Sequence, residues 1–342
     1  MAGYTRIRLD LGMIFPRPEN ELPFLSGFRA VPRRLCVIAC GGFALAACAF
    51  GDELAVTDAD GRLTVSEGDR PVLVFNYQDV QPSDDEGVAR SGYVHPLYDP
   101  EGVPLTDDFP PDHPHHRGVF LAWPRVEVLG SQVDTWHLRG ARPVFEELVP
   151  REAGSAAAAF EASHLWVLDD GTEAMRQYLR YTVHAADETG RAIDLHATVT
   201  NLTGEPIVLR GQTRALYGGL NIRMDGERPD VVITTAEGRL DGDANYIDPP
   251  SPWASHASRS AAEGPHTGVA IFQHPENPDY PARHWTLRRY GFLGAAWPGD
   301  SSYEIDAGAS LDLRYRLFVH RGTADEAGVA GRFDAYRSES GR

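Results

Sequence analysis

The sequence predicts an all-β protein, a large antiparallel β-sandwich with one short C-terminal helix. Apolar and polar residues alternate over 192–201 and 310–320, so every second side chain faces a core, as in half-buried antiparallel strands. Clusters rich in Gly, Asp and Thr separate such runs and mark turns. No glycine-rich strand-to-helix fingerprint appears, which argues against a dinucleotide- or phosphate-binding α/β fold.

The individual elements follow from the same patterns. RPVLVFNYQDV, residues 70–80, reads as an early strand, and about fifteen strands are expected in all. At the C-terminus, Thr323 is placed to cap a helix and Glu326 to complete a capping box. The spacing of Val329, Phe333 and Tyr336 then puts three apolar side chains on one helix face, which we expect to pack across the sandwich edge.

Residues 1–47 are expected to form a leader, followed by one β-sandwich domain over residues 48–342. Arg33 and Arg34 precede LCVIACGGFALAA, which is typical of an export signal over about 31–47 and too short for a stable membrane span. The segment ends in LAAC, which resembles the bacterial lipoprotein box and predicts lipidation of Cys48. Cleavage after Ala49 and an uncleaved anchor are the alternatives. Residues 1–30 do not resemble a signal peptide, so translation is expected to start nearer Val31.

Net charge, cysteine positions and the expected export limit the kinds of binding partner. The formal charge is −17, and an acidic chain repels phosphate backbones, so no nucleic acid is expected as a partner. All three cysteines lie at or before Cys48, so the body has no disulfide or cysteine nucleophile. The expected setting is the periplasm or cell envelope, with membrane contact only through the N-terminal anchor or signal. The expected ligand is a small molecule or a glycan.

A cluster of imidazoles occurs in DHPHHRGVFLAW, residues 112–123, which holds His113, His115, His116 and Arg117. In an extended segment, His113 and His115 point to the same side. Such a pair can bind a divalent metal together with a ligand from elsewhere, transfer protons near neutral pH, or hold sugar hydroxyls. The fourth interpretation is a hydrogen-bonded surface cluster without a function. Residue type and spacing leave all four open.

A second group of polar and aromatic residues lies in IFQHPENPDYPARHWTLRRYG, residues 271–291. Its three prolines predict a stiff, shaped loop rather than a strand. His274 is a further candidate for proton transfer, and a tryptophan face such as that of Trp285 stacks well on sugar C–H groups. The alternative places Trp285 in the core and Arg288 in an ion pair. The candidate ligand-binding residues of this segment are Asn277, Trp285, Arg288 and Tyr290.

Two shorter motifs add candidates. In GGLNIR, Asn221 and Arg223 alternate with apolar residues, so both are expected to face one cleft. DTWHLRG contributes Trp136 as a further ligand contact beside His137, with simple packing as the alternative.

Several separated motifs, in order, resemble the bacterial PmoA-like family, a domain of unknown function often labelled methane oxygenase. They are HPHHRG, a following tryptophan as at Trp136, GGLNIR, HPENPDYP, WTLRRYG and LRYRLFVH, spread from about Tyr93 to His320. The resemblance implies that three motifs of the family are present: a histidine motif (His113, His115, His116, Arg117), a glycine-rich strand motif (Asn221, Arg223) and a C-terminal motif (His274, Asn277, Trp285, Arg288, Tyr290). AWPRVEV and AAWPGD depart from the segments that many relatives carry there. Because particulate methane oxygenase subunits are integral membrane proteins and this body lacks a spanning stretch, methane oxidation is not expected.

The strand-rich body is also similar to galactose-mutarotase-like supersandwiches, which bind sugars on a concave sheet. The pooling of His, Arg, Asn and Trp in three motifs, which this similarity fits, predicts a carbohydrate-active enzyme, an epimerase, lyase or hydrolase, with a His-, Arg- and Trp-lined cleft. His115, His274 and His113 are the candidates for proton transfer. Further candidates for ligand binding are His116, Arg117, Asn221 and Arg223. The alternatives are a non-catalytic sugar-binding lipoprotein, and an enzyme that uses a divalent metal bound by His113 and His115.

Overall fold

The computed structural model describes residues 53–82, 88–214, 216–242, 246–247 and 250–339. The chain divides into two units, Met1–Cys48 and Ala49–Arg342, and all described residues belong to the second. The expected leader over residues 1–47 and the expected lipidation site Cys48 lie outside the described residues. No helix in the described ranges is long and apolar enough to cross a membrane.

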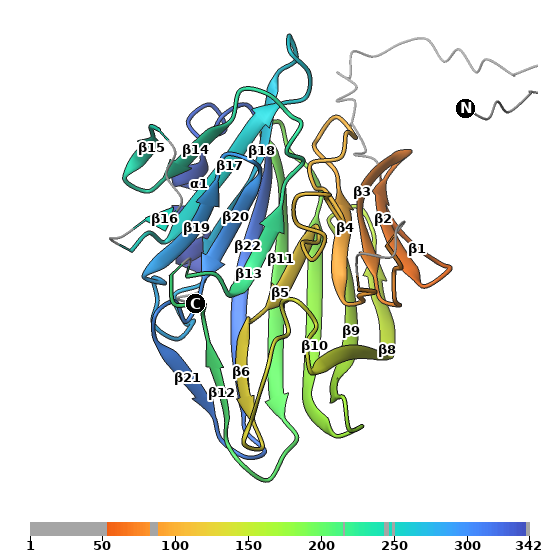
Figure 1. Cartoon of the computed structure of the whole chain (residues 1–342). Coiled ribbons are helices and arrows are strands. Elements are labelled where there is room, and N and C mark those ends of the chain that lie inside the picture. The colour runs from red at the N-terminus through yellow and green to blue at the C-terminus, as the bar shows by residue number, and fades with distance from the viewer. Residues whose placement is uncertain (1–52, 83–87, 215, 243–245, 248–249, 340–342) are drawn as a thin grey trace, which may run out of the picture. The chain divides into compact units, whose positions relative to one another are not determined.

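The first of two large sheets, sheet I, has nine antiparallel strands, which contain four of the candidate residues, Asn221, Arg223, Trp285 and Arg288 (Figure 1). In spatial order its strands are β1 (Leu54–Ala59), β2 (Arg62–Glu67), β3 (Arg70–Asn76), β4 (Tyr93–Leu97), β5 (Val119–Ala122), β13 (Gly219–Arg223), β20 (Phe292–Ala296), β19 (His284–Arg288) and β16 (Tyr246–Ile247).

The second large sheet, sheet II, also has nine strands and contains the longest ones. In spatial order they are β15 (Gly238–Leu240), β14 (Val232–Thr235), β17 (Trp253–Arg259), β18 (His266–Gln273), β22 (Ser310–Arg321), β11 (Gly190–Asn201), β10 (Glu173–His184), β9 (Ala157–Leu168) and β8 (Ala141–Ala153). The alternation predicted over 192–201 is confirmed in β11, where Ile193, Leu195, Ala197 and Val199 are buried.

A small sheet and one helix complete the described fold. Sheet III has the order β21 (Ser302–Ile305), β12 (Ile207–Arg210), β6 (Arg125–Val128) and β7 (Ser131–Val133). The helix α1 (Val329–Glu339) buries Val329, Phe333 and Tyr336, as predicted. It packs on Phe272 and Phe318, on the outer face of sheet II rather than at an edge. The predicted contact between Thr323 and Glu326 is present but closes the turn before the helix.

Sheets I and II face each other across the main core. Phe75 of β3 meets Phe160 of β9 with ring centroids 5.3 Å apart. In β5, Val119 and Leu121 point into this core, whereas Phe120 points to the other face of the sheet. Because side chains alternate along a strand, sheet I has a second, partly covered face. The candidate site lies on that second face.

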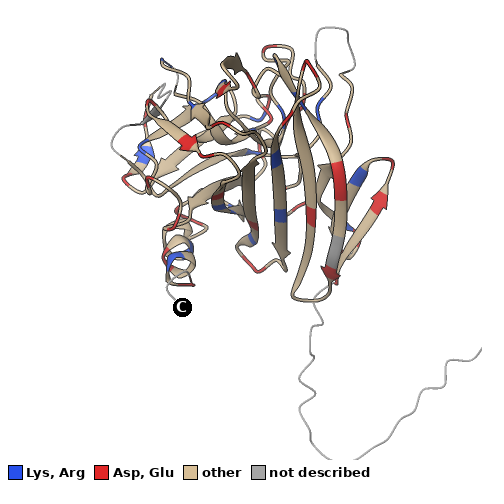
Figure 2. Ribbon diagram, turned by 90° about the horizontal axis from the view of Figure 1, so that it is seen from below, with Lys and Arg blue, Asp and Glu red and all other residues tan. Residues whose placement is uncertain are grey.

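The all-β sandwich predicted from the sequence is thus confirmed, with twenty-two strands in the described ranges rather than about fifteen. The extra strands are mostly short pieces whose pattern is too brief to recognise. The segment over 271–291 is not one loop, because residues 271–273 belong to β18 and residues 284–288 form β19. Acidic and basic residues are interspersed along the described ribbon, as Figure 2 shows.

Candidate functional site

Two successive turns, rather than an extended segment, carry the histidine motif. The amide of His113 donates to Pro110 O and that of His116 to His113 O, both at 2.9 Å. The expected pairing of His113 with His115 on one side of an extended chain is therefore corrected. His113 instead stacks on His116, with ring centroids 4.5 Å apart and planes at 7°, while His115 meets the edge of His116 at 4.6 Å.

Hydrogen bonds from Arg117 hold these turns in place. Its guanidinium donates to the carbonyls of Pro114, His116 and Val88 at 2.6 to 2.8 Å, and it lies over the ring of Phe109. Only 1% of the residue is exposed. Arg117 was predicted to bind the ligand. Its hydrogen bonds instead fix the histidine loop, and part of the residue also lines a cavity.

A hairpin over residues 134–139 brings a fourth imidazole, that of His137, next to the three of the histidine motif. The backbones of Asp134 and Arg139 exchange two hydrogen bonds of 2.9 Å. One carboxylate oxygen of Asp134 accepts the backbone N–H groups of Trp136 and His137, and the other lies 2.7 Å from Nδ1 of His137. An aspartate that accepts local backbone N–H groups favours this type of tight loop. The same side chain therefore shapes the loop and orients the imidazole.

The 134–139 hairpin is fastened by a second buried arginine. Arg90, 2% exposed, donates to the carbonyls of Thr135 and Trp136. Leu138, between His137 and Arg139, has a left-handed φ of 57°, a conformation that costs about 1–3 kcal/mol and needs support from its surroundings. Arg90 supplies part of that support, so it acts as a positioning residue for His137.

The two loops meet at a cavity of about 390 Å³ on the second face of sheet I. His115 and His137 lie side by side in its wall, with ring centroids 4.3 Å apart. A second cavity of about 260 Å³ shares His115, Trp136 and His137 with the first, so the two adjoin. The lining of the larger cavity comprises His113, His115, His116, Trp136, His137, Tyr217, Thr286, Arg288, Tyr290 and Phe292.

Burial sets the protonation of this cluster. Burial, together with the neighbouring His137 and His113, lowers the pKa of His115 to about 3. Burial also lowers the pKa of His116, and both imidazoles are therefore neutral at neutral pH. For Asp134, burial acts to raise the pKa, but the hydrogen bonds from His137 and Trp136 outweigh it and keep the group ionised.

Sheet I also supplies an ion pair behind the histidines. Arg223 of β13, 4% exposed, donates to both oxygens of Asp112 at 3.0 and 3.2 Å, and its guanidinium lies 5.0 Å from the ring centre of Tyr290. Tyr290 in turn stacks on His113 at 5.1 Å. Asn221 lies on the same sheet face, as predicted from the alternation, but is fully buried and donates to Gly219 O. Neither Asn221 nor Arg223 lines the cavity.

A family model described as a family of unknown function (DUF6807) matches residues 62–334. The match covers most of the chain and includes the histidine turns, the 134–139 hairpin and all of β19 and β20. The chain belongs to the DUF6807 family. This match establishes the family, and it does not show the PmoA-like label that the sequence motifs suggested.

Other comparisons place no established activity on this DUF6807 chain. A comparison with the curated proteins found no match. Solved structures that align with it include the α-galactosidase of Lactobacillus brevis (10% identity, 79% of this chain, TM-score 0.41). They also include a protein of Synechocystis sp. PCC 6803 (10%, 79% of this chain and 95% of that one, TM-score 0.38). A third, from Klebsiella pneumoniae, is provisionally named an aldose 1-epimerase (8%, 82% and 86%, TM-score 0.36). This chain spans 39% of the α-galactosidase, and TM-scores below 0.5 carry no function across.

Several predicted residues of the DUF6807 chain lie away from the cavity. Trp285 is fully buried in the main core and donates to Ser251 O, because it alternates on β19 with the outward Thr286 and Arg288. His274 lines a different, open cavity on sheet II, beside Tyr336. Asn277 uses both amide atoms to hold the backbone of Arg314. The structure therefore does not bring His274, Asn277 or Trp285 to His115.

The structure also bears on the metal alternative. Within the described ranges, no group of three or more His, Cys, Asp and Glu side chains is arranged to hold a metal ion. The rings of His113 and His115 are 5.8 Å apart, and Nδ1 of His113 lies 2.9 Å from an oxygen of Asp112. The described residues thus offer this pair no complete ligand set.

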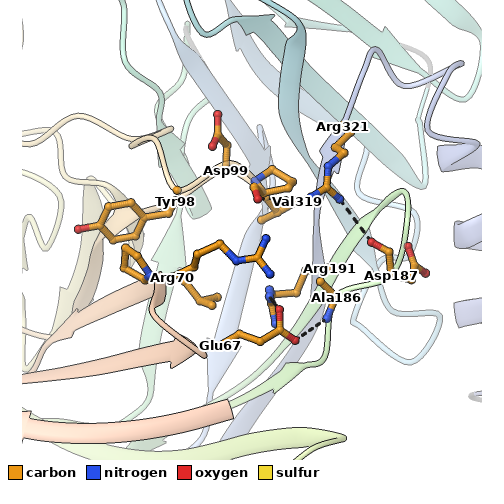
Figure 3. A pocket seen from close by; sticks show the side chains of 13 residues that line it. Glu67, Arg70, Tyr98, Asp99, Ala186, Asp187, Arg191, Val319 and Arg321 are labelled. Atoms are coloured by element: carbon orange, nitrogen blue, oxygen red, sulfur yellow. Dashed lines mark hydrogen bonds and ion pairs between the residues drawn. The ribbon is translucent and has the colours of Figure 1, made fainter. Parts of the chain in front are cut away.

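Another cavity, of about 320 Å³, lies between the β2–β3 turn and the ends of β11 and β22 (Figure 3). Its lining has no histidine, and several of its charged side chains form ion pairs within the lining or with residues just outside it. Glu67 accepts Arg191 at 2.6 Å and the amide of Ala186 at 3.2 Å, and Arg321 donates to Glu101 at 2.9 Å. This cavity has the features of a structural ion-pair network, and the imidazole cavity remains the candidate site.

The sequence predicted Trp136 from DTWHLRG, but not Asp134 or His137, as a site residue. The signal was present in DTWH, where the aspartate precedes the histidine by three residues. That spacing allows one carboxylate to accept backbone N–H groups and the imidazole at once. Arg90, Tyr217, Thr286 and Phe292 were missed, because they come from separate segments that only the folded sheet brings together.

Proposed function

We propose that this protein is an enzyme that transfers protons on a sugar or sugar derivative bound beside His115 and His137. The observation that carries the proposal is the hydrogen bond between Asp134 and His137, whose imidazole lines a cavity with the ring centre of His115 4.3 Å away. An aspartate on Nδ1 fixes the tautomer so that Nε2 is free to accept a proton, and stabilises the imidazolium that forms. His137 is the base, and His115 is the second proton-transfer group.

The closeness of the two imidazoles selects among the possible reactions. Side by side, they reach neighbouring atoms of one ligand, such as an anomeric hydroxyl and the ring oxygen, or a C–H and the adjoining carbonyl oxygen. Glycoside hydrolysis usually needs two carboxyl groups on either side of the bond. None of the described residues that line either imidazole cavity is Asp or Glu. Epimerisation, ring opening or elimination therefore fits better than hydrolysis.

The rest of the wall supports a polyhydroxylated ligand. The cavity volume lies in the usual range of about 300–1,000 Å³ for small-ligand sites. Tyr290, 38% exposed, offers an aromatic surface for C–H groups, and Thr286 and Arg288 offer polar atoms on the same side. Such a mixture of aromatic surface and hydrogen-bonding groups suits a sugar.

The test is a screen in D₂O of free aldoses, ketoses, uronates and glycosides, followed by proton NMR. We expect at least one compound to show catalysed anomer exchange, carbon deuteration or elimination, and His137→Gln to abolish it without lowering the melting temperature. Sugar binding without any such reaction would favour the alternative, a non-catalytic sugar-binding protein, over the enzyme.

The proposal includes an exported, lipid-anchored setting, which rests on the basic pair and the LAAC segment ending at Cys48. Mass spectrometry of the mature N-terminus tests it. A diacylated or triacylated cysteine supports lipidation, and an N-terminus beginning after Ala49 supports simple secretion.

A further inference from the structure

The charge around the imidazole cavities is opposite to that of the whole chain. The formal charge of the protein is −17. Yet the charged side chains that line the two adjoining cavities are all arginines: Arg90, Arg117, Arg139 and Arg288. A local excess of cations in an acidic protein raises the local concentration of anions.

Two of these arginines are buried, and the charges of Asp108 and Asp134 balance them only in part. Arg90 and Arg117 donate to backbone carbonyls of the two site loops, not to carboxylates. The nearest carboxylate of Arg117, that of Asp108, lies 3.8 Å away. Burial and the neighbouring Arg117 lower the pKa of Arg90 to about 9, which is still charged at neutral pH. In a low-dielectric wall such charges keep much of their field.

Arg139 is the cation best placed to touch a ligand. It lies two residues after His137 on the 134–139 hairpin and lines the cavity that shares His115 and His137. It is exposed, and within the described part of the chain its guanidinium has no hydrogen-bond or ion-pair partner. A planar guanidinium matches a carboxylate through two parallel hydrogen bonds.

We propose that the ligand of this site is a sugar acid, whose carboxylate is bound by Arg139 while its reacting atoms lie at His115 and His137. This inference rests on the proposed function and specifies its substrate class. Arg90 and Arg117 contribute through their electric field, and Arg288 lines the larger cavity. When the guanidinium of Arg139 neutralises a carboxylate next to the reacting carbon, the adjoining C–H becomes more acidic and a histidine can remove its proton.

The experiment measures binding rather than turnover. Isothermal titration calorimetry of the full chain uses glucuronate, galacturonate and mannuronate, each compared with its uncharged amide and its parent hexose. We expect at least one uronate to bind about tenfold or more tighter than its amide, the loss expected when one charge-assisted pair is removed. Raising the salt concentration should weaken binding of the uronate and leave binding of the amide unchanged.

The matched variants are Arg139→Gln and Arg142→Gln. Arg142 is an exposed arginine on β8 that lines neither cavity. Arg139→Gln should remove the preference for the acid, and Arg142→Gln should retain it. Equal binding of acid and amide, no binding of any uronate, or tighter binding of glucose 6-phosphate overturns the proposal.

Binding to His137→Gln separates this inference from the proposed function. Uronate binding by both the wild type and His137→Gln, without any reaction in the wild type, would refute the enzyme and retain the acid site. A reaction on a neutral sugar, with no preference for acids, would support the enzyme and refute the acid site.

Discussion

One oxygen of the Asp134 carboxylate lies 2.7 Å from Nδ1 of His137, and the other accepts the backbone N–H groups of Trp136 and His137. The carboxylate is thus held by the same loop that it shapes, and it is 16% exposed. This leaves Nε2 as the ring nitrogen of His137 that is available to a ligand. The pair is the most specific feature of the site, and the first prediction concerns it.

Asp134→Asn should lower kcat by about 10²–10⁴-fold, because an amide can stabilise the wrong tautomer and cannot stabilise the imidazolium. The control is Asp312→Asn, since Asp312 lies 2.7 Å from His196 in an exposed pair remote from the cavity. It should leave turnover unchanged. Nitrogen-15 NMR gives a readout without substrate: His137 should carry its proton on Nδ1 in the wild type and lose that preference in Asp134→Asn. An unchanged tautomer would refute the orienting role.

The two groups of histidines should separate in function. His115→Asn and His137→Gln should each abolish turnover, whereas His274→Gln should leave it within about twofold, because His274 lines a cavity on the other sheet. Melting temperatures of all three variants serve as the control for folding. Loss of turnover in well-folded His274→Gln would contradict the separation of the two cavities and restore the role that the sequence suggested.

Trp285 and Tyr290 should also behave differently. Trp285→Phe should lower the free energy of unfolding by about 2 kcal/mol, through a core cavity and the lost bond to Ser251 O, and leave ligand affinity unchanged. Tyr290→Ala should weaken ligand binding by about tenfold with little effect on stability, because its ring is already partly exposed. Thermal unfolding and calorimetric binding measure the two effects. Weaker binding in folded Trp285→Phe would place the indole in contact with the ligand.

Stability should fall as the solution is acidified below about pH 6.5. Burial lowers the pKa of His256 and of His320 to about 4 each, below the value near 6.5 of an unfolded histidine. Between these values the unfolded chain binds more protons, so each group lowers the free energy of unfolding by about 1.4 kcal/mol per pH unit as pH falls.

Asp108 acts in the opposite direction. Burial raises its pKa to about 6, so its protonation favours the folded state as pH falls below that value. The buried histidines outnumber this single aspartate, since burial also lowers the pKa of His95 to about 4. The net effect of acidification is therefore a loss of stability. Calorimetry from pH 8 to pH 4.5 measures the net slope. His320→Gln should reduce the slope, and the exposed control His196→Gln should not. A melting temperature independent of pH would contradict the prediction.

The fold was open to prediction from sequence because a strand records its burial in a pattern of period two. The alternation in β11 and β22 placed the core residues and indicated the sandwich. The same rule placed Asn221 and Arg223 on one face of β13. The same alternation predicts a buried Trp285, since Thr286 and Arg288 lie on the opposite face of β19. The prolines before β19 suggested a loop instead, so this pattern was not used.

The membership of the site was decided by the tertiary structure. The sequence by itself determined the all-β class, the clustering of three histidines before β5 and the aspartate–histidine spacing in DTWH. It did not determine that His115 meets His137 rather than His274, because that depends on which loops fold over the second face of sheet I. Arg90 and Arg117 fix those loops through backbone carbonyls, and carbonyl groups are present at every residue, so no sequence pattern marks which ones an arginine will bind.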